Sequence, residues 1–298
     1  MDKIELLPVS LLSEHDSDVQ NFRETASRLG IGLGWHYLLD LSWVVQQFRL
    51  KSGMRVLDAG AGTGVMQWWL AERGVDVISA DRLNRQYLSK NFRQRYRVLG
   101  LRKEDLANEK RPSLRDFLPP SSPFRWHLYP KKLSASVRLL RREKSVEPVS
   151  NGTVYIYNQD LSSMPDIAND SVDAVVSISS LEHNSPDDLK LCLAELMRVL
   201  KPGGRLVVTM MAAKSKDWFH KPSRGWCYTE ATLRKIFDLP SHSRSNYDKY
   251  DELFEELRNC DELRDNLADF YFQSGNNGMP WGGWDPKYQP VGVVKTKK

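Results

Sequence analysis

An aspartate followed by alternating glycines has the residue types and spacing that could hold a small charged ligand. Asp58 ends the apolar part of the run VLDAGAGTG, in which glycines stand at Gly60, Gly62 and Gly64. Glycines let the backbone turn sharply and approach a ligand closely. A carboxylate just before such a loop suits a ligand with a cationic amine better than a dinucleotide, whose pyrophosphate rests on the NH groups of a helix end.

Two further aspartates end apolar segments that are expected to be strands. Asp81 ends VDVISAD, seventeen residues after Gly64, and Asp160 ends TVYIYNQD. The apolar run into Asp58 predicts a strand, and the segment VMQWWLAERG after the glycines predicts a helix. In an open α/β sheet ligands bind at the carboxyl ends of the strands, so these aspartates are expected at one edge.

These segments, together with SVDAVVSISSLEHN and LKPGGRLVVTM, resemble the motifs of class I S-adenosylmethionine-dependent methyltransferases, in particular the small-molecule branch. The resemblance covers roughly residues 53–211, with a gap. It implies an α/β, Rossmann-like fold with a mostly parallel seven-stranded sheet, an antiparallel last strand and helices on both faces. The last strand, PVGVVKTK, should lie beside the fifth, Arg205 to Met210, and Phe270 to Gln273 is a candidate for the sixth.

The resemblance also implies a set of residues that bind the cofactor, S-adenosylmethionine. Asp58 would face its methionine amine, Asp81 would accept from the ribose hydroxyls, and Asp160 would accept from the adenine amine. The remaining members of the predicted set are Gly60, Gly62, Gly64, Arg82, Leu161 and Ser177.

A base would be needed if the methyl acceptor is a hydroxyl group, and histidine is well suited to that role near neutral pH. His183 is the catalytic candidate because it follows the fourth predicted strand, beside Glu182 and Asn184. The alternative is that this Leu-Glu-His turn only shapes the loop and the start of the next helix. The three cysteines lack any paired metal-ligand spacing, so no metal site is expected.

The whole chain, 1–298, is expected to form a single methyltransferase domain. Residues 1–50 would be an N-terminal arm, mobile at its start, followed by a flap helix that begins at Trp35 to Tyr37. The cofactor-binding core would be 53–82 and 152–211, with a basic insertion at 83–151. Residues 212–298 would supply an aromatic-rich lid and the last strands.

The basic insertion is the feature that the cofactor fold does not require. From Arg82 to Lys144 there are 18 lysines and arginines against five acidic residues, a net of +13 in a chain whose total is +5. Asn84 to Val98 is expected to be a basic helix. Such an excess of positive charge could bind a diphosphate, an RNA backbone or an anionic membrane surface, the last as peripheral contact only.

The favoured function is transfer of a methyl group to a small-molecule or glycan acceptor, with oxygen as the expected acceptor atom and a sugar or sugar nucleotide as the expected class. An RNA methyltransferase that uses the basic insertion and an inactive protein that only binds the cofactor are the alternatives. DNA is disfavoured because SSLEHN stands where amino-methylating DNA enzymes have a Pro-Pro-aromatic turn. A cytoplasmic location is expected, because the N-terminus is too short and acidic for a signal peptide. The oligomeric state is left open.

Overall fold

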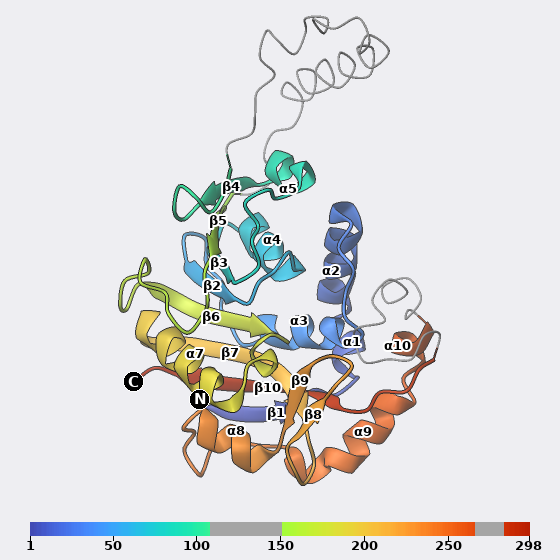
Figure 1. Cartoon of the computed structure of the whole chain (residues 1–298). Coiled ribbons are helices and arrows are strands. Elements are labelled where there is room, and N and C mark those ends of the chain that lie inside the picture. Colours follow the sequence, from blue (N-terminus) through green and yellow to red (C-terminus); the bar gives the residue numbers. More distant parts are fainter. Residues whose placement is uncertain (108–150, 266–282) are drawn as a thin grey trace, which may run out of the picture.

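The computed structural model describes residues 1–107, 151–265 and 283–298, and ten strands of these ranges form one sheet (Figure 1). Its main path has the order β1-β10-β7-β6-β2-β3-β5-β4, and the β8–β9 hairpin joins it at β7. The strands are β1 (Lys3–Leu6), β2 (Arg55–Ala59), β3 (Asp76–Asp81), β4 (Arg97–Gly100), β5 (Thr153–Asn158), β6 (Val172–Ile178), β7 (Leu200–Ala212), β8 (Trp218–His220), β9 (Gly225–Tyr228) and β10 (Gln289–Thr296). The helices are α1 (Leu11–Glu14), α2 (Asp16–Leu29), α3 (Tyr37–Val45), α4 (Val65–Glu72), α5 (Lys90–Arg95), η3 (Leu181–His183), α7 (Pro186–Val199), α8 (Glu230–Ile236), η4 (Tyr247–Lys249), α9 (Tyr250–Arg258) and α10 (Asp261–Asp265).

The centre of the sheet has the predicted fold class. Strand β2 pairs in parallel with β3 and β6, β5 pairs with β3, and β7 pairs with β6. The last strand, β10, runs antiparallel along β7, as the resemblance implied. Ala174, Val175 and Val176 are buried in β6, which fits an apolar strand covered on both faces.

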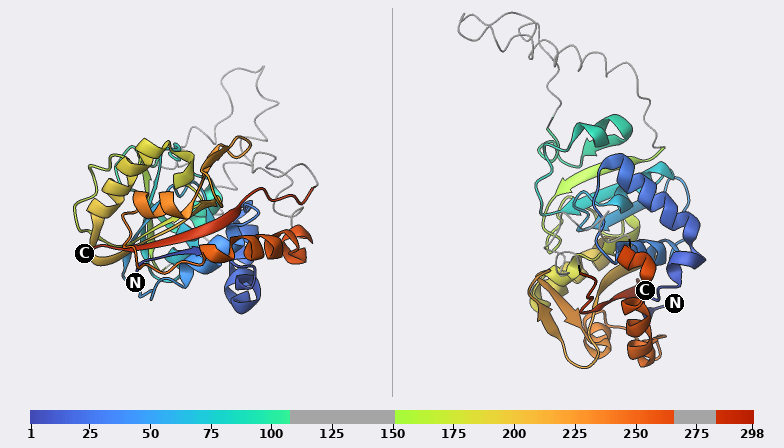
Figure 2. Two further views of the ribbon diagram at one scale, coloured as in Figure 1. Left: turned by 90° about the horizontal axis from the view of Figure 1, so that it is seen from below. Right: turned by 90° about the vertical axis from the view of Figure 1, so that its right-hand side faces the viewer.

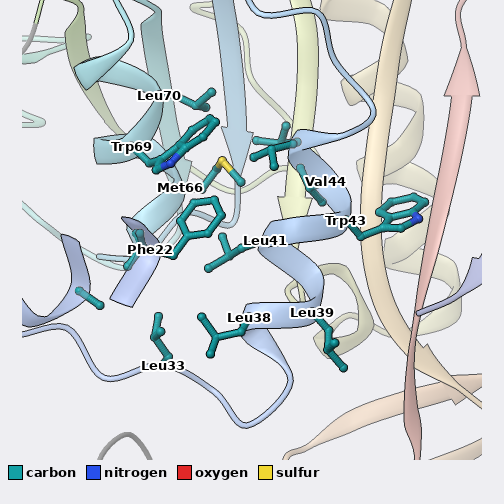
Figure 3. Packing of buried hydrophobic residues seen from close by; sticks show 14 of the residues in the cluster. Phe22, Leu33, Leu38, Leu39, Leu41, Trp43, Val44, Met66, Trp69 and Leu70 are labelled. Atoms are coloured by element: carbon teal, nitrogen blue, oxygen red, sulfur yellow. The ribbon is translucent and has the colours of Figure 1, made fainter. Parts of the chain in front are cut away.

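Two layers of helices cover the two faces of this sheet (Figure 2). One layer contains α1 to α4, whose buried side chains form an apolar cluster with the sheet; Figure 3 shows Phe22, Leu41, Met66 and Trp69 meeting in it. The other layer contains α7 and α8 and packs on the opposite face, whereas α9 contributes Leu253 to that face and Leu257 to the first cluster. Ser185 caps α7 by accepting from the Asp188 amide at 3.2 Å, as its place before a proline suggests.

The expectation of a mobile leading arm is wrong. Strand β1 pairs antiparallel with β10, and the Leu6 amide donates to the side chain of Asn246 at 2.7 Å. Helix α2 buries Val19 and Phe22 in the core. The N-terminal strand therefore takes the sheet edge beyond β10, and the alternative candidate, Phe270 to Gln273, lies outside the described residues.

The beginning of the supposed insertion also differs from expectation. In place of one basic helix over Asn84 to Val98, the chain forms the short helix α5 and then β4, a parallel edge strand beside β5. Val98 packs against the core cluster, which explains why this part follows the sheet. The segment 108–150, with about half of the basic excess, lies outside the described residues.

Two short helices follow η4 along the chain. Helix α9 ends at Arg258 and α10 begins at Asp261, with Leu257 and Leu263 both buried. Within the described ranges, none of the helices has the length and apolar character needed to cross a membrane.

Candidate functional site

The glycine-rich loop lies between β2 and α4, at the carboxyl edge of the parallel strands. Gly60 has φ +75° and Gly62 has φ +47°, a conformation that disfavours other residues. A Cβ on Gly60 would also lie 1.7 Å from the Ser180 hydroxyl oxygen. Gly64 has an ordinary φ of −59° and is the N-cap of α4. The backbone conformation therefore favours glycine strongly at Gly60 and Gly62 and much less at Gly64.

Two side chains that were not predicted from the sequence, Gln67 and Arg85, hold this loop by hydrogen bonds to its carbonyls. The amide of Gln67 donates to the Gly64 carbonyl at 3.0 Å, and its oxygen accepts from Ser79 at 2.7 Å. Arg85, only 3% exposed, donates to the Gly62 carbonyl at 2.9 Å and to the carbonyls of Ser79 and Tyr157. Because these contacts fix the loop carbonyls, the loop is preorganised.

Asp58 lies at the end of β2 and is 2% exposed. Its Oδ2 atom has no hydrogen-bond partner among the described residues. Burial raises the pKa of its carboxyl from the ordinary 3.8 to about 7, although the nearby Arg85 guanidinium opposes the rise. Asp58 lines a cavity of about 60 Å³ together with Tyr37, Gly60 and Met66. A buried acceptor without a partner beside a cavity indicates a place for a ligand's donor group.

Asp81 ends β3 and faces the loop. Its two carboxylate oxygens accept from the amides of Gly62 and Leu83, each at 2.7 Å. A carboxylate oxygen can accept more than one hydrogen bond, so both oxygens can also accept from ligand hydroxyls. The position suits the predicted contact with two neighbouring hydroxyls.

The main cleft has a volume of about 770 Å³ and brings six of the predicted residues together. Those six are Gly60, Asp81, Arg82, Asp160, Leu161 and His183. At one end, the hydroxyl and the amide of Ser162 donate to the Asp160 carboxylate and lower its pKa. Leu161 beside it is 8% exposed and supplies an apolar wall.

His183, in η3, lines the part of the cleft that adjoins the turn of the β8–β9 hairpin. Its Nδ1 atom is 3.1 Å from the carbonyl oxygen of Arg224. A carbonyl oxygen can only accept, so Nδ1 carries the proton in this contact and the lone pair is on Nε2. The arrangement fixes the ring in the tautomer that can act as a base at Nε2.

The roof of this part of the cleft is the β8–β9 hairpin, which contributes Phe219 and Trp226 to the cleft. Their rings meet edge to face with centroids 5.4 Å apart. From the predicted flap, Tyr37 also lines the cleft, whereas Trp35 and His36 are buried against Tyr288. The predicted lid and flap regions therefore both contribute side chains to the cleft, and their closure over a ligand stays a prediction.

Ser177 is the predicted site residue that the fold turns away from the cleft. It is fully buried in β6, and its hydroxyl donates to the carbonyl of Ala59 at 2.8 Å. This contact ties β6 to the end of β2 beside the glycine loop. In the part of the chain that the structure describes, no group of three or more histidine, cysteine or acidic side chains could hold a metal ion.

Comparison with known proteins adds a family and relatives. The family described as "Methyltransferase domain" matches residues 129–208, a range that includes β5, β6 and most of β7 but not the glycine loop. The demethylmenaquinone methyltransferase of Renibacterium salmoninarum is 28% identical over 233 residues, which are 78% of this chain and 70% of that protein.

Two solved structures are similar at lower identity. The Haemonchus contortus phosphoethanolamine N-methyltransferase 2, solved with S-adenosylhomocysteine, is 15% identical with a TM-score of 0.49, over 97% of this chain and 60% of that chain. The [4+2]-cyclase SpnF is 17% identical with a TM-score of 0.45, over 100% and 99% of the two chains. The domain match and the curated relative support S-adenosylmethionine-dependent methyl transfer, with S-adenosylmethionine as the cofactor.

Proposed function

We propose that the protein transfers a methyl group to an oxygen atom of a small-molecule acceptor, with a sugar or sugar nucleotide as the favoured class. The supporting observation is the contact between His183 Nδ1 and the Arg224 carbonyl. It leaves Nε2 as the basic nitrogen of a side chain that lines the same cleft as Asp81 and Asp160.

Residues of the main cleft and of the small cavity that contains Asp58 fit the cofactor. The unpartnered Oδ2 atom of Asp58 would accept from the ammonium group, beside a Gly60 turn that has no space for a side chain. Asp81 would accept hydrogen bonds from the ribose hydroxyls, while Asp160 and Leu161 would hold the adenine. Bound there, S-adenosylmethionine supplies an activated methyl group.

The work of the chain is then to position the acceptor and to remove one proton. His183 takes the proton of the acceptor hydroxyl at Nε2, and the Arg224 carbonyl holds the ring in place through Nδ1. Phe219 and Trp226 cover the acceptor and exclude water. Methyl transfer depends chiefly on such positioning, because the reacting atoms must be held in line at roughly 3 Å.

The test is a methyl-transfer assay with labelled S-adenosylmethionine across sugars, nucleotide sugars, phenols, demethylmenaquinone and RNA. Demethylmenaquinone is included because the curated relative carries that name. The proposal requires product from a hydroxyl acceptor and a loss of roughly a hundredfold in His183→Ala, with cofactor affinity retained. Methylation of RNA and of no other acceptor would refute the proposal and favour an RNA methyltransferase that uses the basic insertion.

A further inference from the structure

The turn of the β8–β9 hairpin meets the His183 turn so closely that their relative position is fixed. Arg224 lies at this turn with φ +53°, a left-handed conformation unusual for a residue other than glycine. Its amide donates to the Lys221 carbonyl at 3.2 Å, while its own carbonyl accepts from His183. Strained backbone of this kind is often retained at functional sites.

Gly225 shows how little space separates the two turns. A Cβ on this residue would lie 2.0 Å from Met211 Cε, 3.2 Å from Glu182 Cγ and 3.5 Å from His183 Nδ1. A side chain at this position would require the Met211 and Glu182 side chains to shift. Because Arg224 directly precedes Gly225, the Cα atom of Arg224, from which its side chain extends, is also held close to the His183 ring.

The Arg224 side chain is exposed and lines the main cleft. The described residues offer its guanidinium no ion pair within 4.0 Å, in contrast to Arg102, Arg198 and Arg234, which have carboxylate partners. The carboxylates that line the cleft, Asp81 and Asp160, follow β3 and β5 and belong to the part that is proposed to bind the cofactor, which we call the cofactor end. The part formed by η3 and the β8–β9 hairpin is the acceptor end. The acceptor end therefore presents a cation beside two aromatic rings.

We infer that Arg224 recognises an anionic group, a carboxylate or a phosphate, on the methyl acceptor. The inference rests on the proposed function and names the acceptor class more closely: a hydroxyl compound whose ring lies against Phe219 and Trp226 and whose anion binds the Arg224 guanidinium. Arginine binds both anions through two parallel hydrogen bonds, which orients the ligand as well as attracting it. The same turn that binds the anion holds His183, so anion binding places the acceptor hydroxyl near Nε2.

The experiment uses matched pairs of acceptors with the full-length protein. Each pair differs in the anion: 4-hydroxybenzoate against 4-hydroxybenzyl alcohol for the carboxylate, and glucose 1-phosphate against glucose for the phosphate. We expect the anionic member of at least one pair to have a kcat/KM tenfold or more above its neutral partner, and we expect Arg224→Gln to abolish that preference through KM. Arg224→Lys should keep part of it, and the control Lys221→Gln, an exposed residue of the same hairpin, should keep all of it.

A second readout does not need turnover. Binding of UDP, uridine, 4-hydroxybenzoate and 4-hydroxybenzyl alcohol is measured by tryptophan fluorescence and calorimetry. Equal use of anionic and neutral acceptors, or an anion preference that survives Arg224→Gln, would overturn the role of Arg224 while leaving methyl transfer intact. Anion binding that requires Arg224, in a protein that methylates no hydroxyl acceptor, would uphold the anion site and refute the proposed function.

Discussion

Asp58 should make the ligand-free protein less stable at neutral pH, because a buried carboxylate without a partner is unfavourable. Burial raises the pKa of Asp58 from 3.8 to about 7. At about 1.4 kcal/mol per pH unit this rise corresponds to at most about 4 kcal/mol. Between about pH 4 and about pH 7 the folded chain binds a proton here that the unfolded chain has released. This contribution to the free energy of unfolding is therefore full below about pH 4 and is lost as the pH rises through about 7.

The perturbation is Asp58→Asn, which keeps the size of the side chain and removes its charge. At about pH 8 the ligand-free variant should be more stable than the wild type by up to about 4 kcal/mol, and at about pH 4 the two should differ little. Part of the gain will be offset, because Arg85 loses one of its neighbouring carboxylates while Asp81 and Asp105 remain. Urea unfolding and thermal melting over this pH range measure the difference. Asp81→Asn is the matched control, since Asp81 already accepts two backbone hydrogen bonds.

The same substitution should weaken cofactor binding, so stability and affinity should change in opposite directions. In the wild type, affinity for S-adenosylmethionine should rise by about tenfold or more from about pH 5.5 to about pH 7, because only the ionised fraction of Asp58 binds the ammonium. Calorimetry should show this pH dependence in the wild type and its absence in Asp58→Asn. A variant that is less stable than the wild type at about pH 8 and binds the cofactor normally would refute the assignment of Asp58.

Three further outcomes are expected. Replacing Arg85 with methionine should destabilise the fold by roughly 3 to 5 kcal/mol in urea titrations, because buried carbonyls of the loop and of β3 and β5 lose their donor; a fully stable variant would show that Arg85 is dispensable. Turnover of a hydroxyl acceptor should fall by roughly a hundredfold in His183→Gln, because the variant has no basic nitrogen to take the hydroxyl proton; unchanged turnover in that variant would assign the proton transfer to another group. Acceptor affinity should change little over a few-fold rise in salt, because a small anion engages few of the basic residues at 82–144; a loss on the order of a thousandfold would indicate an extended phosphate backbone.

The parts of the fold that the sequence predicts well are those whose residues are buried on both sides. Strand β6 is a near-continuous apolar run, because helices cover both faces of a parallel sheet, and β3 buries Val77, Ile78 and Ala80 before it ends in Asp81 at the ligand edge. Strand β1 was missed since four residues carry too little pattern, and its partner β10 lies almost 300 residues away along the chain. Pairing between the two ends of a chain leaves no local signal.

The candidate site also has residues that can be predicted from the sequence and residues that cannot. The carboxylates at strand ends can be predicted because their spacing along the chain reflects the repeat of strand and helix. Arg85 could not, because it lies in a basic stretch where most neighbours are solvated, and only the folded loop supplies the carbonyls that bury it. Ser177 shows the reverse case: a polar residue near a strand end is a fair ligand candidate, yet its hydroxyl donates to Ala59 and serves the sheet.

The structure also explains why the acceptor cannot be inferred from the cofactor motifs. The cofactor end is built from β2, β3 and β5 and the loops that follow them, whereas the acceptor end is built from η3 and the β8–β9 hairpin, elements outside the repeat of strand and helix. The hairpin residues Arg224, Phe219 and Trp226 make no contact with Asp58 that fixes their identity, because Asp58 lines a different cavity. Acceptor specificity in this protein should therefore depend on these hairpin residues, which the strand-and-loop pattern of the cofactor motifs does not contain.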